Sequence, residues 1–100
     1  MSAFNVTKEN FKTEVLEAKT PVLVDFWAPW CGYCRRLGPV VDRLAAQYEG
    51  KLLVGELAEQ FKVMTIPSLF VFQNGEHGEA IIAPGSKAQI EEFMRAQGAL

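Results

Sequence analysis

The sequence predicts an α/β fold, a mixed central β-sheet flanked by helices, in one domain spanning residues 1–100. Residues 22–27, VLVDFW, are almost continuously apolar, which is typical of a central strand covered on both faces. A helix-periodic segment follows, with apolar positions between Leu37 and Tyr48. Asn74-Gly75 then marks a β-hairpin. One hundred residues, about half of them apolar, suit one compact core.

The N-terminal half starts with a short apolar segment at 4–6, which predicts a strand. Thr7 can cap a helix whose inner face carries Phe11, Val15 and Ala18 at helical spacing. The apolar triplet at 52–54 predicts a short third strand, and residues 56–61 are compatible with one or two helical turns.

The C-terminal half contains a strand at 68–72 and a weakly patterned partner strand at 80–82. Ser86 and Gln89 form a capping box for the last helix. That helix buries three apolar side chains and ends near a glycine: Ile90, Phe93, Met94 and Gly98.

Charge and hydropathy exclude several function classes. The net charge is −2, with no basic patch for nucleic acid and no basic amphipathic stretch for a membrane surface. No apolar run is long enough to span a bilayer. The first residues do not resemble a signal peptide, so we expect a cytoplasmic protein.

The only two cysteines, Cys31 and Cys34, form a CxxC motif directly after the predicted central strand. Strand, loop, CxxC and helix form the context in which this motif indicates thiol–disulfide chemistry. Cys31 falls at the helix N-terminus, where unpaired amides and the helix dipole favour the thiolate, which is the nucleophile. Arg35 and Arg36 are either solvated charges or groups that help to hold this thiolate.

Two other uses of the cysteine pair fit less well. A structural zinc site needs about four Cys or His ligands, and the chain adds only His77, which we interpret as an exposed loop residue. A structural disulfide would close too small a loop to stabilise the fold much. We therefore expect no metal and no bound cofactor apart from the redox-active Cys31–Cys34 disulfide.

Asp25 is the one charged residue in the central apolar strand. Burying a carboxylate is costly, so the pKa should rise toward neutrality, which suits general acid–base work. The alternative is an aspartate on an exposed bulge. Trp30, beside Cys31, is interpreted as part of a contact surface, with a core position as the alternative. Ile66-Pro67 is compatible with an ordinary trans turn or with a cis bond.

Three segments together resemble the thioredoxin family over nearly the whole chain. Residues 24–35, VDFWAPWCGYCR, resemble the active-site segment of thioredoxins. Residues 63–69, VMTIPSL, resemble their cis-proline segment, and residues 72–76, FQNGE, resemble their hairpin.

The resemblance implies a thioredoxin fold and a role for each matching residue. Cys31 would attack the substrate disulfide, Cys34 would resolve the mixed disulfide, and Asp25 would accept the Cys34 proton. The substrate groove would be lined by the residues around the cysteines and the cis-proline: Trp30, Gly32, Tyr33, Ile66, Pro67 and Ala83.

Three of the departures from the family pattern bear on the site or the fold. Tyr33 replaces the usual proline, and Gly-Tyr resembles the dipeptide of periplasmic disulfide isomerases. Ala83 stands near a usual glycine. About nine residues are missing after Gly55, and Glu56 takes the place of a lysine that normally lies near the buried aspartate. We therefore expect a shortened third strand and third helix, loss of central-strand pairing, and a monomer that can form a swapped dimer.

The expected function is reduction of protein disulfides by dithiol–disulfide exchange. The alternatives are a disulfide oxidase or isomerase, a non-catalytic binding module on the same fold, and a shortened chain with impaired folding. The expected partners are disulfide-containing proteins and a flavin-dependent thioredoxin reductase, with no nucleic acid and no membrane.

Overall fold

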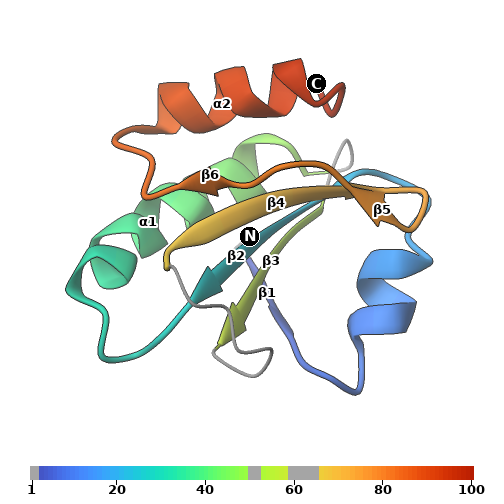
Figure 1. The fold of residues 1–100 in the computed structure, drawn as a ribbon, viewed down its shortest axis with the longest axis horizontal. Helices are drawn as coiled ribbons and strands as arrows, with labels where there is room; N and C mark the ends of the chain where they lie inside the picture. Colours follow the sequence, from blue (N-terminus) through green and yellow to red (C-terminus); the bar gives the residue numbers. More distant parts are fainter. Residues whose placement is uncertain (1–2, 50–52, 59–65) are drawn as a thin grey trace.

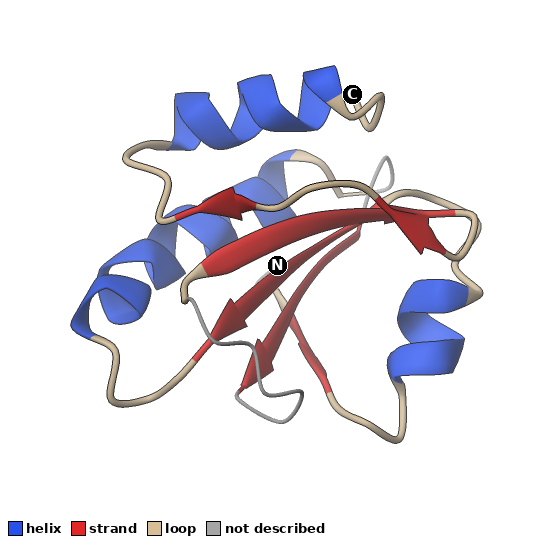
Figure 2. Ribbon diagram, viewed as in Figure 1, coloured by secondary structure: helices blue, strands red, loops and turns tan. Residues whose placement is uncertain are grey.

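A computed structural model of the protein describes residues 3–49, 53–58 and 66–100. The described strands are β1 (Phe4–Val6), β2 (Val22–Trp27), β3 (Leu53–Ala58), β4 (Ser68–Gln73), β5 (Glu76–His77) and β6 (Ile81–Ile82). The helices are the short π-type segment η1 (Lys12–Leu16), α1 (Gly32–Gln47) and α2 (Lys87–Ala96). Figure 2 shows the strands forming one twisted sheet between these helices.

The sheet is mixed, with strand order β1-β3-β2-β4-β5, and β6 pairs with β4. β1, β3 and β2 run parallel, whereas β4 runs antiparallel to β2. Five of the six β2 residues are buried, as the apolar run predicts for a central strand. This confirms the α/β prediction with a mixed sheet.

Successive residues of β2 face different layers of the molecule. Leu23 belongs to a core cluster with side chains of α1 and α2, while Val22, Val24 and Phe26 belong to a second cluster that η1 covers. The side chains of one strand therefore hold helices on both faces of the sheet. In Figure 1, η1 is the blue helix, well separated from α1 and α2.

The N-terminal helix is shorter than its apolar spacing suggests. The Thr7 hydroxyl accepts a hydrogen bond from the Asn10 amide at 3.2 Å, and the Thr7 amide donates to Asn10 Oδ1 at 2.7 Å. Val15 is buried, and Phe11 and Ala18 pack against its cluster. The predicted inner face is thus confirmed, although the regular helix is confined to η1.

The expected shortening of the third strand is wrong. β3 is six residues long and pairs along all of β2, from Val22 opposite Leu53 to Trp27 opposite Ala58. The expectation of helical turns beginning at residue 56 is wrong for the same reason. A buried central strand needs hydrogen-bond partners along its length, and this requirement overrides the weak strand pattern of 56–58. Residues 59–61, the rest of the predicted helical segment 56–61, lie outside the described residues.

Gly55 allows the first and third strands to approach closely. A Cβ at this position would lie 2.6 Å from Val6 Cγ2 and 3.1 Å from the Phe4 ring. Phe4 is the residue opposite Gly55 in register. The absence of a side chain at Gly55 therefore makes room for two β1 side chains on the sheet.

The hairpin turn and the last helix form as predicted, but the strand that follows the turn is β5, and the predicted partner strand at 80–82 appears as β6, which pairs with the opposite end of β4. Asn74 and Gly75 have φ values of 55° and 80°, and β5 follows directly. His77 is exposed as predicted, but it lies in this strand and not in a loop, and its ring contacts the Phe70 and Phe72 rings. The Ser86 hydroxyl accepts from the Gln89 amide at 3.2 Å and caps α2. The Gln89 side chain accepts from the Gly85 amide instead of the Ser86 amide.

Candidate active site

The cysteines lie where β2 gives way to α1. Ala28 is buried directly after the strand, and its carbonyl accepts a hydrogen bond from the Cys31 amide at 3.1 Å. This turn places Cys31 at the N-cap of α1, where its Sγ accepts from the Cys34 amide at 3.2 Å. Sulfur thus occupies the position where an N-cap side chain satisfies an unpaired helix amide, and the same amide would stabilise a Cys31 thiolate.

The two sulfurs differ in access. Cys31 and Cys34 form a disulfide with a Cα–Cα distance of 5.2 Å. Cys34 is only 3% exposed, whereas Cys31 is partly exposed. An external disulfide can therefore reach Cys31 but not Cys34, which matches the expected roles of attacking and resolving thiol.

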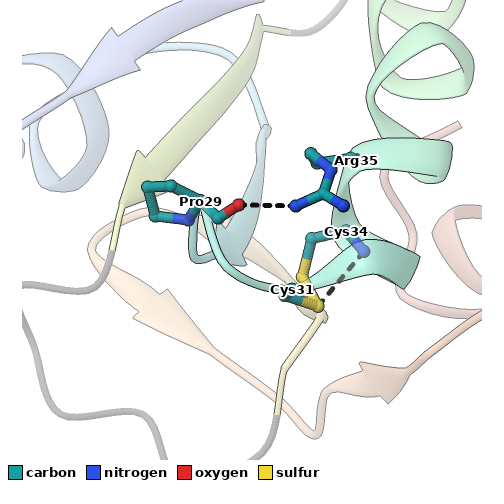
Figure 3. The surroundings of a disulfide bond; sticks show 4 residues. All are labelled: Pro29, Cys31, Cys34 and Arg35. Atoms are coloured by element: carbon teal, nitrogen blue, oxygen red, sulfur yellow. Dashed lines mark hydrogen bonds between the residues drawn. A yellow bond between two sulfur atoms is a disulfide. The ribbon is translucent and has the colours of Figure 1, made fainter.

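The arginines after the motif contact groups other than the sulfurs. Figure 3 shows the Arg35 guanidinium beside the disulfide, with Nη1 donating to the Pro29 carbonyl at 2.9 Å. The Arg36 guanidinium lies 5.3 Å from the centroid of the Tyr33 ring, a cation–π distance. Both side chains are exposed, and their contacts brace the loop and the tyrosine ring, a role that neither interpretation included.

Asp25 is buried at 2% exposure, so the exposed-bulge alternative is wrong. A pocket of about 240 Å³ lies beside it and also borders the buried Cys34. The pocket is lined by residues of β2 and of one face of α1: Asp25, Trp27, Cys34, Arg35, Gly38, Pro39 and Asp42. Asp25 and Cys34 therefore share one cavity, as proton transfer between them requires.

Pro67 lies at the same end of the sheet as the cysteine loop. Phe26 pairs with Ser68, so the residue before β4 lies next to the end of β2, where the chain leaves for Cys31. Pro67 is fully buried, Ile66 is half-buried, and the peptide bond between them is cis.

Tyr33 and Ala83 connect this proline to the cysteine helix. The Ala83 amide donates to the Pro67 carbonyl at 2.9 Å. The Tyr33 hydroxyl lies 3.1 Å from the Ala83 carbonyl and 2.8 Å from the Pro84 carbonyl. Trp30 is 69% exposed, which contradicts a core position and fits a contact surface.

Sequence reasoning missed Trp27, Asp42 and Pro84. Asp42 shares an α1 stripe with Cys34 and Gly38, four residues apart at each step, and this spacing could have indicated that Asp42 borders the cavity. Trp27 follows Asp25 on the same face of β2 by strand alternation. Nothing in the sequence indicates that the Pro84 carbonyl would receive a hydrogen bond from Tyr33.

The described part of the chain lacks two further features. It holds no group of three or more His, Cys, Asp or Glu residues that could bind a metal ion. Within the same residues, no helix combines the length and the apolar character needed to cross a membrane.

A partly exposed sulfur at a helix N-cap, paired with a buried one on a mixed α/β sheet, defines the class of thiol–disulfide oxidoreductases. The Thioredoxin family model matches residues 2–96, and the chain belongs to this family. The protein is accordingly a disulfide oxidoreductase, and a non-catalytic binding module is not favoured.

Relatives of known name agree over most of the chain. It is 41% identical to Thioredoxin 1 of Nostoc sp., over 93% of this chain and 94% of that one. It is also 41% identical to a thioredoxin of Synechocystis sp., over 89% and 91% of the two chains. The identity is 44% to an M-type chloroplastic thioredoxin of Chlamydomonas reinhardtii, over 89% of this chain and 69% of that one.

Proposed function

We propose that the protein acts mainly as a reductase of disulfide bonds in other proteins. The observation that carries this proposal is the asymmetry of the pair: Cys31 is accessible and sits at the α1 N-cap, whereas Cys34 is buried behind it. A thiolate stabilised at an accessible helix N-terminus is the species that attacks a disulfide.

The reaction proceeds in two exchanges. The Cys31 thiolate attacks one sulfur of the substrate disulfide, that S–S bond breaks, and the second substrate sulfur leaves as a thiolate. Cys34 then attacks Cys31 Sγ, which releases the first substrate sulfur. The substrate gains two electrons and becomes a dithiol, and the protein is left with the Cys31–Cys34 disulfide.

Asp25 would accept the proton of Cys34 as that thiol becomes the second nucleophile. The cavity that borders both residues supports this role, because its volume of about 240 Å³ is large enough for bridging water. In the described residues the buried Trp27 Nε1 has no protein acceptor, so such water would also satisfy this group. The proton would then reach solvent through the same pocket.

The substrate would lie across the surface formed by Trp30, Gly32, Tyr33, Ile66, Pro67 and Ala83. We infer that a thioredoxin reductase returns the pair to the dithiol and that the protein works as a cytoplasmic monomer. Catalytic insulin reduction, driven by such a reductase, would test the first inference, and light scattering of the purified protein would test the second.

The reduction potential decides between reductase and oxidase. Tyr33 lacks the ring with which a proline fixes φ, so the loop can relax toward the dithiol and the disulfide becomes more oxidising. The reduction potential is about −270 mV for thioredoxin and about −120 mV for a strong oxidase. For the Cys31–Cys34 disulfide of this protein we expect roughly −210 to −240 mV. Tyr33→Pro should lower the value.

Equilibration with glutathione buffers measures this potential directly. A wild-type value near −120 mV would overturn the reductase in favour of an oxidase. A value at or below about −270 mV would rule out the effect of the tyrosine while leaving the reductase intact.

A further inference from the structure

Tyr33 places a hydroxyl against two backbone carbonyls far along the chain. It is the second residue of α1, and its oxygen lies 2.8 Å from the Pro84 carbonyl and 3.1 Å from the Ala83 carbonyl. A phenol carries one hydrogen, so this donor is shared between the two acceptors. Arg36 lies over the ring from the next turn of the helix and helps to fix its orientation.

The segment held by Tyr33 has a strained backbone. Ala83 has a φ of 44°, a left-handed conformation that is unfavourable for a residue with a Cβ. It retains this conformation between two hydrogen bonds: its amide donates to Pro67, and its carbonyl receives the Tyr33 hydroxyl. Tyr33 therefore links the cysteine helix, residues 83–84 and the cis-proline.

We propose that Tyr33 is a positioning residue whose hydroxyl holds residues 83–84 in the conformation that receives a polypeptide substrate. This inference rests on the proposed function, since it concerns the wall of the proposed substrate surface. A polypeptide disulfide contacts that wall, whereas a small disulfide such as oxidised glutathione reacts with Cys31 through far fewer contacts. Because residues 83–84 are already ordered before binding, less conformational entropy is lost when a substrate contacts them, and only the larger substrate does so extensively. The hydroxyl thus favours protein disulfides over small ones.

Tyr33→Phe removes the hydroxyl and keeps the ring under Arg36. The test compares second-order rate constants of the reduced protein with insulin and with oxidised glutathione. Because the same thiolate attacks both, their ratio cancels any change in the reactivity of Cys31. One hydrogen bond of ordinary strength corresponds to a loss of about two- to tenfold in the insulin-to-glutathione ratio.

Tyr48→Phe is the matched control, because the chain has two tyrosines and Tyr48 donates its hydrogen bond to Glu91 on α2. It should leave the ratio at the wild-type value. An unchanged ratio in Tyr33→Phe, or an equal loss in both variants, would overturn the proposal.

Hydrogen exchange of the Ala83 amide gives a second measurement that needs no substrate. In Tyr33→Phe this amide should exchange about two- to tenfold faster, because its hydrogen bond to Pro67 opens more often. Tyr48→Phe should not change it. Equal exchange in Tyr33→Phe and wild type would refute the positioning role even if insulin is reduced. Failure of the wild type to reduce insulin would instead refute the proposed function.

Discussion

The difference in exposure between Cys31 and Cys34 has a direct chemical consequence. Cys31 is partly exposed and accepts a hydrogen bond from a helix amide, whereas Cys34 is 3% exposed. Alkylation of the reduced protein at neutral pH should therefore modify Cys31 first. Mass spectrometry of a brief iodoacetamide reaction measures the order, and preferential labelling of Cys34 would contradict it.

Single-cysteine variants separate the two roles. Cys34→Ser should accumulate mixed disulfides with substrates, because the first exchange proceeds and the second has no nucleophile. Cys31→Ser is the control and should trap little, since the remaining thiol is buried. Non-reducing gels resolve the trapped species.

Ala83 is a second residue whose local conformation allows a prediction. Its φ of 44° is unfavourable for alanine and costs glycine nothing. Ala83→Gly should raise the free energy of unfolding by about 0.5–1 kcal/mol, after the greater entropy of glycine in the unfolded chain is subtracted. Urea unfolding measures the change.

A helical alanine is the matched control for this substitution. Ala46 is exposed within α1, and Ala46→Gly should lower stability by about 0.5–1 kcal/mol. Losses of equal size in both variants would mean that Ala83 stores no strain.

At the scale of elements, β2 has two features with opposite effects on stability. It is the central strand of the sheet, and it buries a carboxyl group at Asp25. Glu56 stands opposite Asp25 in the β3 register, where the family pattern has a lysine nearby. A buried carboxylate reduces stability, so its retention in this strand is better explained by proton transfer than by packing.

Asp25→Asn should therefore slow exchange and stabilise the fold. Loss of a general base typically costs about 100-fold or more in the step that it assists, and removal of the buried charge should add about 1 kcal/mol at neutral pH. The rate of insulin reduction and the urea midpoint are measured on the same preparation.

Asp42→Asn serves as the control. This half-buried carboxylate lines the same pocket but already accepts a hydrogen bond from the Ala3 amide at 3.1 Å, so the substitution should change the rate little. A faster enzyme or a less stable Asp25→Asn protein would refute the role of Asp25.

At the scale of the whole molecule, the two long helices are joined by a polar contact. Tyr48, at the end of α1, donates a hydrogen bond to Glu91 on α2, and Gln47 and Lys87 approach the same carboxylate at 3.4 Å and 3.9 Å. The Tyr48 hydrogen bond is the main cause that lowers the pKa of Glu91, and the same bond raises the pKa of Tyr48.

These shifts predict how the stability difference between wild type and Tyr48→Phe depends on pH. A lowered carboxyl pKa stabilises the fold above its unfolded value of about 4.3, and that contribution is lost as pH falls below it. A raised phenol pKa stabilises the fold below about pH 10, and that contribution is lost as pH rises further. The free energy of unfolding of wild type should thus exceed that of Tyr48→Phe by a constant amount between about pH 4.3 and about pH 10. This difference should become smaller below and above that range.

Thermal melts of both proteins across the pH range measure the gap. Tyr33→Phe is the control, because the hydrogen bond that it loses runs to backbone carbonyls, which do not titrate. The stability difference between this variant and wild type should therefore not become smaller below about pH 4.3. A Tyr48→Phe gap that is independent of pH would show that Glu91 is not the partner in solution.

The sequence by itself determined the features that depend on neighbouring residues. The apolar run at 22–27 indicated a central strand, Asn74-Gly75 a hairpin, and Ser86 with Gln89 a helix start, because pattern, turn and cap are read within a few residues. The CxxC motif and its place before a helix indicated the redox chemistry for the same reason.

Only the tertiary structure decided the features that depend on partners far along the chain. β3 extends to Ala58 because β2 needs a pairing neighbour along its whole length, although the local pattern of 56–58 suggested a helix. Asp42 and Trp27 border the cavity at Asp25 because α1 packs on that face of the sheet. The hydroxyl of Tyr33 meets carbonyls fifty and fifty-one residues away because the fold brings the β6–α2 connection beside the cysteines. Contacts of this kind have no local signature, since a hydrogen bond depends on distance in space and not on separation in sequence.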